Sequence, residues 1–371
     1  MQNLGHFGLN IVGDANIENC NGSSACCDNY NDALGVSSCT AQYACTSIGA
    51  INPTYVNGIG DREVPHNGPS GEKKVKSYED LLSNAPGIVP KLPCGPALRL
   101  TTNRQHLTGA AWYSRQQEIR EGFETTFTFR ITNPSINCRF MDDVYTHCKS
   151  RGSDGFAFVI QAQSMYALGE NGMGLGYQGI ENSLAIEFDT TFNFELLEPY
   201  ENHVSVHSGG WRKSNNASQT YSFGSSTAIP ELTSGIPIQA KIVYKPVFDP
   251  SVLYTDNFYA SAKLNEYLEN ADYYEGGQAD FGTGLGMLYV HVYDMFEPKL
   301  ITPINIDALL KLNHGRAFVG FTGATGSASY QVQDILDWEF TSYRQDPEYV
   351  PPVVVNEDGA HKCRGASCVH L

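Results

Sequence analysis

Two carboxylates stand two residues apart in a stretch of the chain that has the composition of a β-strand. Glu187 and Asp189 alternate with apolar side chains at Ile186 and Phe188. Because successive side chains of a strand point to opposite faces, both carboxylates project from one face and the apolar side chains from the other. Such a pair is typical either of a cation site or of a polar sheet edge in contact with solvent.

Three further polar residues follow this pair. Asn193 and Glu198 come from an acidic, loop-like segment, and His203 begins the next strand-like run. Carboxylate and amide oxygens are the ligands that calcium prefers, whereas carboxylates with an imidazole suit a transition metal such as manganese. The ordered spacing favours two neighbouring metal sites that share carboxylates. His207, on the same strand face as His203, is interpreted as a hydrogen-bonding residue rather than a ligand.

The segments that must position these residues are predicted to be strands. Apolar or alternating runs occur at residues 97–101, 123–131, 156–161, 184–189, 203–207, 238–244, 287–293, 317–322 and 335–341. Helical patterns are short: residues 77–82, residues 307–312, and a segment at 262–277 that is consistent with a surface helix or an ordered loop. Many strands joined by glycine-rich turns predict an all-β sandwich of antiparallel sheets.

Charge and cysteine content restrict the partners and the compartment. The chain of 371 residues has a net charge of −16 at pH 7, which disfavours nucleic acid and anionic membranes and favours divalent cations. No apolar run approaches the length needed to insert across a membrane. The ten cysteines fall into even groups: six from Cys20 to Cys94, then Cys138 with Cys148, then Cys363 with Cys368. Even groups predict disulfides in a secreted or cell-surface protein, with zinc binding by the first group as the alternative.

The chain is predicted to form one sandwich domain over residues 1–342, with two insertions. A cysteine-rich, disulfide-stapled insertion covers about residues 16–93, and a Tyr- and Gly-rich insertion covers about residues 248–284. Residues 343–371 form a Pro-rich tail with a Cys363–Cys368 clip. Glycosylation sequons begin at Asn21 and Asn216, as expected of an extracellular glycoprotein.

Several blocks of the sequence resemble the L-type, legume-lectin-like family. Residues 153–158 (SDGFAF) are similar to its Asp-Gly-x-Ala-Phe motif, and residues 174–180 (GLGYQGI) to its glycine-rich loop. Residues 9–15, 98–101, 109–113, 317–326 and 334–340 resemble further blocks of the family in the same order. The resemblance implies a concanavalin A-like jelly roll that binds glycans or glycoproteins with the help of calcium and a transition metal.

The resemblance also implies the metal ligands. The transition metal, manganese or another, would be bound by Glu187, Asp189 and His203. Ca²⁺ would be bound by Asp189, the Thr191 carbonyl, Asn193 and Glu198, and the two ions would be bridged by Asp189 and Glu198. Glu198 stands where the family usually has Asp. Its longer side chain must be aimed differently to bridge two ions, which weakens the case for the transition-metal site more than for calcium.

The carbohydrate-binding roles follow from the same resemblance. Asp154, the Gly176 amide and the Asn193 side chain would bind the sugar hydroxyls, because a hydroxyl both donates and accepts hydrogen bonds. Specificity would come from the loop that contains Gly326, Ser327 and Ala328. The family has a cis peptide before the sugar-binding Asp, so we expect a cis Ser153–Asp154 bond.

One departure concerns the aromatic ring that commonly stacks on the sugar in this family. Thr191 occupies its position, Phe192 is expected to point to the other face, and Phe194 lies beyond Asn193. Tyr177 or Tyr330 from a neighbouring loop could replace the ring, although simple packing is the more frequent role of such residues.

These observations favour a metal-dependent, non-catalytic lectin. The alternative is a structural, lectin-fold subunit of an extracellular coat, filament or appendage, in which the insertion and the tail contact other protomers of an assembly or homo-oligomer. Some glycoside hydrolases share this sandwich and use Glu-x-Asp-x-x-Glu, with two carboxyl groups in defined roles. Phe192 replaces the closing Glu here, so we expect no catalysis.

Overall fold

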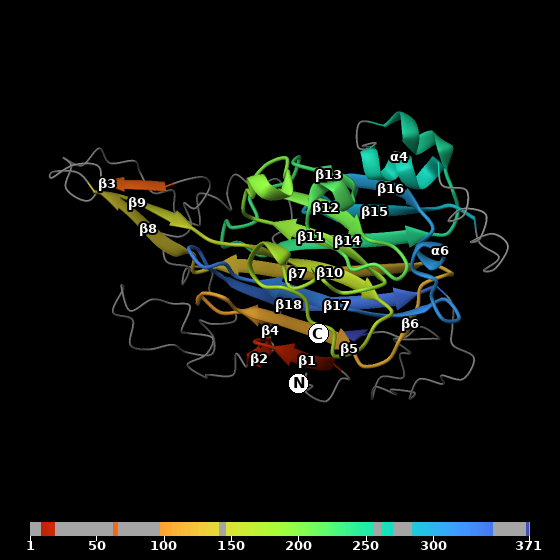
Figure 1. Cartoon of the computed structure of the whole chain (residues 1–371), viewed down its shortest axis with the longest axis horizontal. Coiled ribbons are helices and arrows are strands. Elements are labelled where there is room, and N and C mark those ends of the chain that lie inside the picture. The colour runs from red at the N-terminus through yellow and green to blue at the C-terminus, as the bar shows by residue number, and fades with distance from the viewer. Residues whose placement is uncertain are drawn as a thin grey trace, which may run out of the picture.

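The computed structural model describes residues 9–18, 62–65, 97–140, 146–255, 258, 261–269, 284–343 and 369–370 of the chain. Within these ranges most of the regular structure is β, and two large antiparallel sheets pack face to face (Figure 1). This arrangement confirms the predicted all-β jelly-roll sandwich.

The first sheet carries the predicted metal ligands. Its strands lie in the order β1-β5-β17-β10-β11-β12-β13, and all its neighbouring pairs are antiparallel. Their bounds are Leu9–Gly13 (β1), Thr108–Tyr113 (β5), Arg316–Ala324 (β17), Gly155–Gln161 (β10), Ser183–Asp189 (β11), His203–Ser208 (β12) and Ser222–Ser226 (β13). A short strand, β6 (Gln117–Glu118), also pairs with β17.

The second sheet closes the sandwich from the other side. Its order is β16-β15-β14-β7-β18-β4-β2, with β19 (Val369–His370) paired to β18. The bounds are Leu300–Ile304 (β16), Gly286–Val292 (β15), Ile238–Lys245 (β14), Phe123–Thr132 (β7), Val332–Ser342 (β18), Ala97–Thr101 (β4) and Asn16–Glu18 (β2). Strand β2 falls within the predicted insertion, so the sandwich includes the first residues of that region.

Alternating side chains on the strands build the core between the sheets. On β7, Phe123, Phe127 and Ile131 face inward and are at most 1% exposed, whereas Glu124 faces solvent. The Phe127 ring is central, with centroid distances of 4.9–6.3 Å to the rings of Phe129, Phe156, Phe158, Phe188 and Phe321. These rings come from both sheets, so aromatic contacts fix the way the sheets face each other.

A second, smaller apolar cluster lies on the outer face of the first sheet. It combines side chains from the strands, such as Ala157 and Ala185, with side chains from long loops, such as Leu175, Tyr177 and Ala217. The loops therefore cover part of the face from which the Glu187 and Asp189 side chains project.

Three strands form a separate small sheet that extends beyond one end of the sandwich (Figure 1). They are β3 (Arg62–Pro65), β9 (Thr146–Arg151) and β8 (Ser135–Phe140), and we call this sheet the arm. Cys138 and Cys148 are direct partners in the β8–β9 ladder. The arm begins where the chain leaves the second sheet after β7.

Helices are few and short in the described ranges. They are α4 (Ala262–Glu269), α6 (Ile306–Leu310) and the 3₁₀ segments Gly172–Gly174, Phe194–Leu196, Gln219–Tyr221 and Pro250–Tyr254. The first part of the 262–277 segment is therefore helical. No helix in this part of the chain has both the length and the apolar character needed to cross a membrane.

The predicted strands agree closely with the observed ones. The 97–101 run matches β4, the 123–131 run lies within β7, and the predicted 307–312 helix overlaps α6. The helix predicted at 77–82, most of the cysteine-rich insertion, the Asn21 sequon and the Cys363–Cys368 clip lie outside the described residues.

Candidate metal and carbohydrate site

Two neighbouring strands, β11 and β12, bring three of the predicted metal ligands together. The β11–β12 register places Asp189 opposite His203 and Glu187 opposite Ser205, while Phe188 packs into the core between the sheets. The two carboxylates and the imidazole of His203 are at most 1% exposed. The prediction that both carboxylates share one strand face is confirmed, and the alternative of a solvated sheet edge is wrong.

The Glu187 carboxylate is held by side chains of this chain. Tyr177 donates its hydroxyl to Oε2 at 2.7 Å, and Oε1 lies 2.8 Å from His207 Nε2 and 3.3 Å from His203 Nε2. Burial by itself would raise the pKa of Glu187, but the charges and hydrogen bonds of the two histidines lower it to about 2. Glu187 is therefore an ionised carboxylate whose Oε2 is hydrogen-bonded, while its buried Oε1 faces the two imidazoles without a hydrogen-bond partner. His207 makes the polar contacts predicted for it, with the Asn216 carbonyl and the Ser205 hydroxyl.

The four predicted calcium ligands lie at the last residue of β11, Asp189, and in the short loop that follows it, which we call the calcium loop. The Thr191 N–H donates to Asp189 Oδ1 at 2.6 Å. The backbone N–H of Asn193 donates to Glu198 Oε2, and its side-chain amide donates to Oε1 at 3.2 Å. These hydrogen bonds use N–H groups of Thr191 and Asn193, whose oxygen atoms are the groups expected to bind calcium.

The carboxylates of this loop are destabilised by burial and by one another. Burial raises the pKa of Asp189 well above its ordinary value, and the nearby carboxylates of Glu198 and Glu187 raise it further. Burial also raises the pKa of Glu198 to about 7, although hydrogen bonds from Asn193 act in the opposite direction. A cation beside these groups would favour their ionised forms. Carboxylate, amide and backbone carbonyl oxygens in one loop therefore fit calcium.

The predicted transition-metal ligands do not fit in the same way. That site needs a carboxylate–imidazole cluster made by Glu187, Asp189, Glu198 and His203. Across the described ranges, however, no group of three or more His, Cys, Asp or Glu side chains is arranged to hold a metal ion. In the structure Glu187 Oε2 accepts the Tyr177 hydroxyl and Glu198 accepts hydrogen bonds from Asn193, whereas the buried Glu187 Oε1 has no hydrogen-bond partner. The calcium loop needs only two side chains of these types.

Asp154 lies beside the calcium loop at the start of β10. The Ser153–Asp154 peptide is cis, as expected. Thr190, the first residue after β11, donates its backbone N–H and its hydroxyl to the Asp154 carbonyl, each at 2.9 Å. The residue is 5% exposed, and its Oδ2 has no hydrogen-bond partner in the structure. Burial raises the pKa of Asp154 to about 7, against the effect of a hydrogen bond from Ser153.

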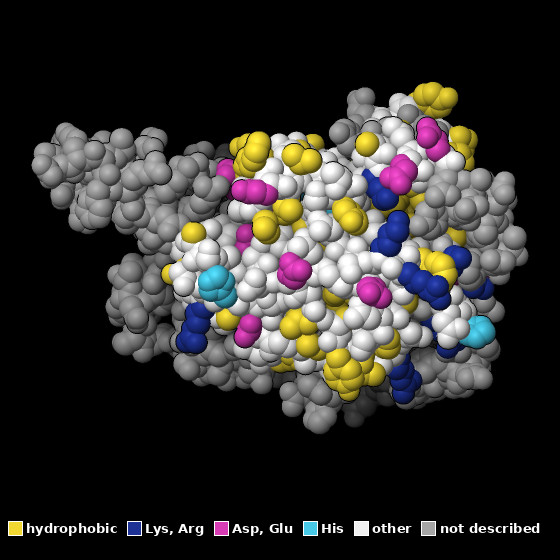
Figure 2. Space-filling model, in the orientation of Figure 1, with side chains coloured by type: hydrophobic (Ala, Val, Ile, Leu, Met, Phe, Trp, Pro, Cys, Tyr) yellow, Lys and Arg dark blue, Asp and Glu magenta, His cyan; other side chains and the backbone are white. Residues whose placement is uncertain are grey.

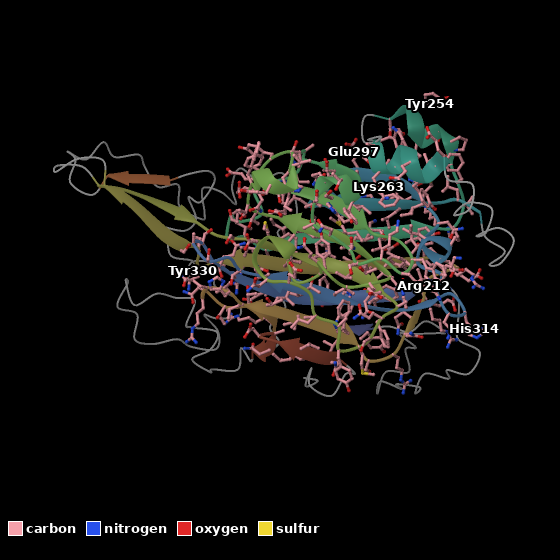
Figure 3. All side chains as sticks on the ribbon, in the orientation of Figure 1. Arg212, Tyr254, Lys263, Glu297, His314 and Tyr330 are labelled. Atoms are coloured by element: carbon pink, nitrogen blue, oxygen red, sulfur yellow. The ribbon has the colours of Figure 1, made fainter. Side chains whose placement is uncertain are left out.

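Two glycines leave room beside this unpartnered oxygen. A Cβ atom added at Gly326 would lie 3.0 Å from Asp154 Oδ2, and one added at Gly172 would lie 3.9 Å from it. The predicted specificity loop, with Ser327 and Ala328 exposed, is therefore next to Asp154. Figure 3 shows Tyr330, which follows this loop, at the end of the sandwich where the arm emerges, far from His314 at the other end.

The Gly176 amide does not face this space. Its N–H donates to the Glu170 carbonyl at 2.9 Å, and the residue packs closely against β17. This geometry disagrees with the role predicted for Gly176, and the glycine-rich loop approaches Asp154 through Gly172 instead. Sequence reasoning missed Gly172 because several glycines stand in the loop and only its folded path decides which of them faces the carboxylate.

The aromatic residues near the site differ in whether they could stack on a sugar. Tyr177 is fully buried and bound to Glu187, so it does not provide a surface on which a sugar can stack. Thr191 is also buried. Phe192 and Phe194 are 44% and 73% exposed on the calcium loop, while Tyr330 is half-buried.

Comparison with known proteins shows which family these elements resemble. Residues 89–250, which include β10, β11, β12 and the calcium loop, match the model of the legume lectin domain. Similar solved structures include the metal-free form of lectin I-B4 from Griffonia simplicifolia, with 18% identity and a TM-score of 0.41, covering 66% of this chain and 86% of that one. The Bauhinia forficata lectin in complex with GalNAc has 20% identity and a TM-score of 0.40, and the match covers 75% of this chain and 97% of that lectin. Peanut lectin with a 9mer peptide has 17% identity and a TM-score of 0.41, and the match covers 76% of this chain and 97% of peanut lectin.

The family match, the motifs in their order and the two antiparallel sheets agree with one another. Residues 89–250 therefore match the legume lectin domain, and the chain has an L-type, legume-lectin-like fold of the concanavalin-type jelly-roll class.

Proposed function

We propose that this protein is a secreted lectin that binds glycans at Asp154 and depends on calcium to do so. The observation that carries the proposal is the buried Asp154 Oδ2, which lacks a hydrogen-bond partner and has glycines beside it. An ionised carboxylate accepts hydrogen bonds only, so neighbouring hydroxyls of a sugar are suitable partners. The Asn193 side chain, on the adjoining loop, would add a second polar contact.

Calcium would be held by Asp189, Glu198 and the oxygens of Thr191 and Asn193. When bound, it supplies the positive charge that two buried, mutually repelling carboxylates need. Thr190 joins this loop to Asp154 through its two hydrogen bonds to the Asp154 carbonyl. Fixing the loop therefore fixes the sugar-binding carboxylate, without calcium touching the sugar.

Other features support a secreted, non-catalytic protein. Direct partners in an antiparallel ladder have Cα atoms about 4.5–5.5 Å apart, which is within the range that a disulfide spans. The register of Cys138 and Cys148 thus supports a disulfide, and hence an oxidising compartment. Phe192 stands where a sandwich hydrolase of this type needs its second Glu.

The surface charge bears on the class of partner. On the face shown in Figure 2, Asp and Glu side chains are spread over the middle, and most of the visible Lys and Arg side chains gather toward one end. Nucleic acid requires many cationic contacts along its phosphates. Together with the net charge of −16, this distribution favours neutral glycans over nucleic acid as the ligand.

A glycan array tests the proposal. The wild-type protein is applied in calcium and again in EDTA, beside Asp154→Ala and a matched charge-removal variant, Glu297→Gln, whose exposed side chain lies between β15 and β16. We expect binding that requires calcium, is lost in Asp154→Ala and persists in Glu297→Gln. Equal binding by Asp154→Ala and wild type would refute the assigned site.

The arm favours a second candidate, a structural role in an extracellular assembly. It extends a three-stranded sheet away from the sandwich, where it is placed to contact another protomer (Figure 1). Calcium-loaded protein that binds no glycan on the array but self-associates in light scattering would favour this role over the first.

A further inference from the structure

Three cationic side chains gather around one tryptophan in this otherwise acidic protein. Trp211, Arg212 and Lys213 follow one another in the turn after β12, and Lys311 follows α6. The guanidinium carbon of Arg212 and the Nζ of Lys311 each lie 4.1 Å from the centroid of the Trp211 ring. These two cationic groups are therefore at most about 8 Å apart. We call Arg212, Lys213 and Lys311 the basic cluster.

Backbone hydrogen bonds hold the segments that carry the basic cluster. The Arg212 N–H donates to the side-chain oxygen of Asn182, and the Lys213 carbonyl accepts the Asn182 N–H at 3.3 Å. The Lys311 N–H donates to the Asp307 carbonyl at the end of α6. Contact with the shared aromatic ring further restricts two cations that would otherwise move freely in solvent. The cluster is therefore partly preorganised, which reduces the entropy lost when an anion binds.

The charge of the basic cluster is exposed and is not neutralised by neighbouring carboxylates. All three side chains are exposed, and none forms an ion pair with a carboxylate in the part of the chain that the structure describes. Asp307, the carboxylate of α6, is buried and already bound by Arg120. Glu181 is exposed on the segment bridged to Ser214, beside the cluster, but forms no ion pair with it. These cations therefore remain available to an anion from solution.

The basic cluster and the proposed sugar site lie toward opposite ends of the sandwich. Arg212 lies toward the end that carries His314, whereas Tyr330, which follows the specificity loop, lies at the other end (Figure 3). Most of the Lys and Arg side chains visible in Figure 2 gather toward the end that carries His314. A ligand of the cluster would thus occupy a surface separate from Asp154, and its binding would need no calcium.

The chemistry of the cluster fits the acidic groups of a polysaccharide. A guanidinium and an ammonium group both bind sulfate or carboxylate oxygens through charge-assisted hydrogen bonds, and acidic polysaccharides carry such groups on successive sugar rings. Duplex DNA is more densely charged, with one charge per about 1.7 Å, and its remaining phosphates would face an acidic surface in a chain of net charge −16. We propose that the basic cluster is a second binding surface, and that its ligand is an acidic polysaccharide.

The fluorescence of Trp211 reports on this binding. Of the three tryptophans, Trp112 and Trp338 are fully buried and Trp211 is partly exposed, so acrylamide quenching follows mainly Trp211. The full chain is titrated with chondroitin sulfate at low salt in EDTA, which separates this surface from the calcium-dependent one. We expect saturable protection of Trp211 by chondroitin sulfate and none by neutral dextran. Equal protection by dextran, or no protection by chondroitin sulfate, overturns the proposal.

Matched substitutions locate the contact. Arg212→Gln removes a cation of the cluster, and Arg104→Gln removes an exposed cation beside the specificity loop, where the Arg104 carbonyl accepts the Thr325 hydroxyl. A Lys or Arg beside an anionic surface strengthens binding about fivefold. Arg212→Gln should therefore bind chondroitin sulfate about fivefold more weakly, the double variant with Lys311→Gln about 25-fold more weakly, and Arg104→Gln like the wild type. Unchanged affinity in the double variant, or an equal loss in Arg104→Gln, overturns the assignment.

Measurements on the wild type test the same surface without any substitution. Contacts from three cations to a linear polyanion should make the logarithm of the affinity fall with the logarithm of the salt concentration, with a slope of roughly 2–3. Iodide, an anion, should quench Trp211 more strongly than caesium, although the whole chain is acidic. A slope near zero or stronger quenching by caesium contradicts the proposal. Duplex DNA that binds as tightly as chondroitin sulfate contradicts the choice of partner.

Discussion

Replacing Asp154 by Asn should make the metal-free protein more stable while weakening its glycan binding. The pKa of Asp154 is raised by burial from 3.8 to about 7. Each pKa unit corresponds to about 1.36 kcal/mol, so the ionised carboxylate costs the folded state roughly 4 kcal/mol. Asn has nearly the same shape and no charge, and it removes that cost.

The sign of the pH dependence follows from linkage. A carboxyl group whose pKa is higher in the folded chain than in the unfolded chain stabilises the fold less as the pH rises from 3.8 through about 7. The variant should therefore resemble the wild type near pH 4 and exceed its stability by up to about 4 kcal/mol above pH 8.

Urea denaturation in EDTA at pH 4.5, 6 and 9 measures this difference, with Glu297→Gln as the exposed control. A stability difference that does not grow with pH would refute the reasoning. On the glycan array, loss of one charge-assisted hydrogen bond of ~1.5–3 kcal/mol should weaken binding about 10- to 150-fold. A variant that gains stability and keeps its affinity would show that Asp154 is buried for a reason other than sugar recognition.

Two further predictions concern calcium and the core. The raised pKa values of Asp189 and Glu198, the latter about 7, mean that protons compete with calcium, so calcium affinity measured by calorimetry should fall below pH 7 by roughly tenfold per pH unit for each proton that calcium displaces. Affinity that is constant from pH 8 to 5 would contradict the assigned ligands. Phe127→Ala removes the ring at the centre of the core and should lower the free energy of unfolding by ~3–5 kcal/mol. Phe296→Ala, at a side chain that is 94% exposed, should change it by less than about 0.5 kcal/mol, and similar losses in the two variants would contradict the assigned packing.

Strand positions could be predicted from the sequence because alternation is a local property. In 125–131 and 184–189 the apolar side chains recur at every second position, so one face of each strand must be buried whatever its neighbours are. The same local rule placed Glu187 and Asp189 on a common face. Alternation does not give strand order, because β10 lies between β11 and β17, which are remote from each other in the chain.

The glycine-rich loop marks a limit of sequence reasoning. Residues 172–179 contain several glycines, and each is a reasonable donor when only residue types are known. The folded path turns the Gly176 N–H toward Glu170 and places Gly172 beside Asp154. A backbone N–H has no residue-specific signature, so its direction follows only from the surrounding turns.

The sequence by itself determined the fold class, the strand faces and the set of oxygen groups proposed to bind calcium, since each depends on residue type and spacing within a short segment. Tertiary structure decided which of these groups remain open to a ligand. Tyr177 reaches Glu187 from a loop and His207 from a neighbouring strand, and Tyr177 takes one oxygen of the carboxylate that local spacing had assigned to a metal. Whether a buried charge is balanced by the protein or by an ion depends on groups brought together from distant parts of the chain, and only the packed fold supplies that information.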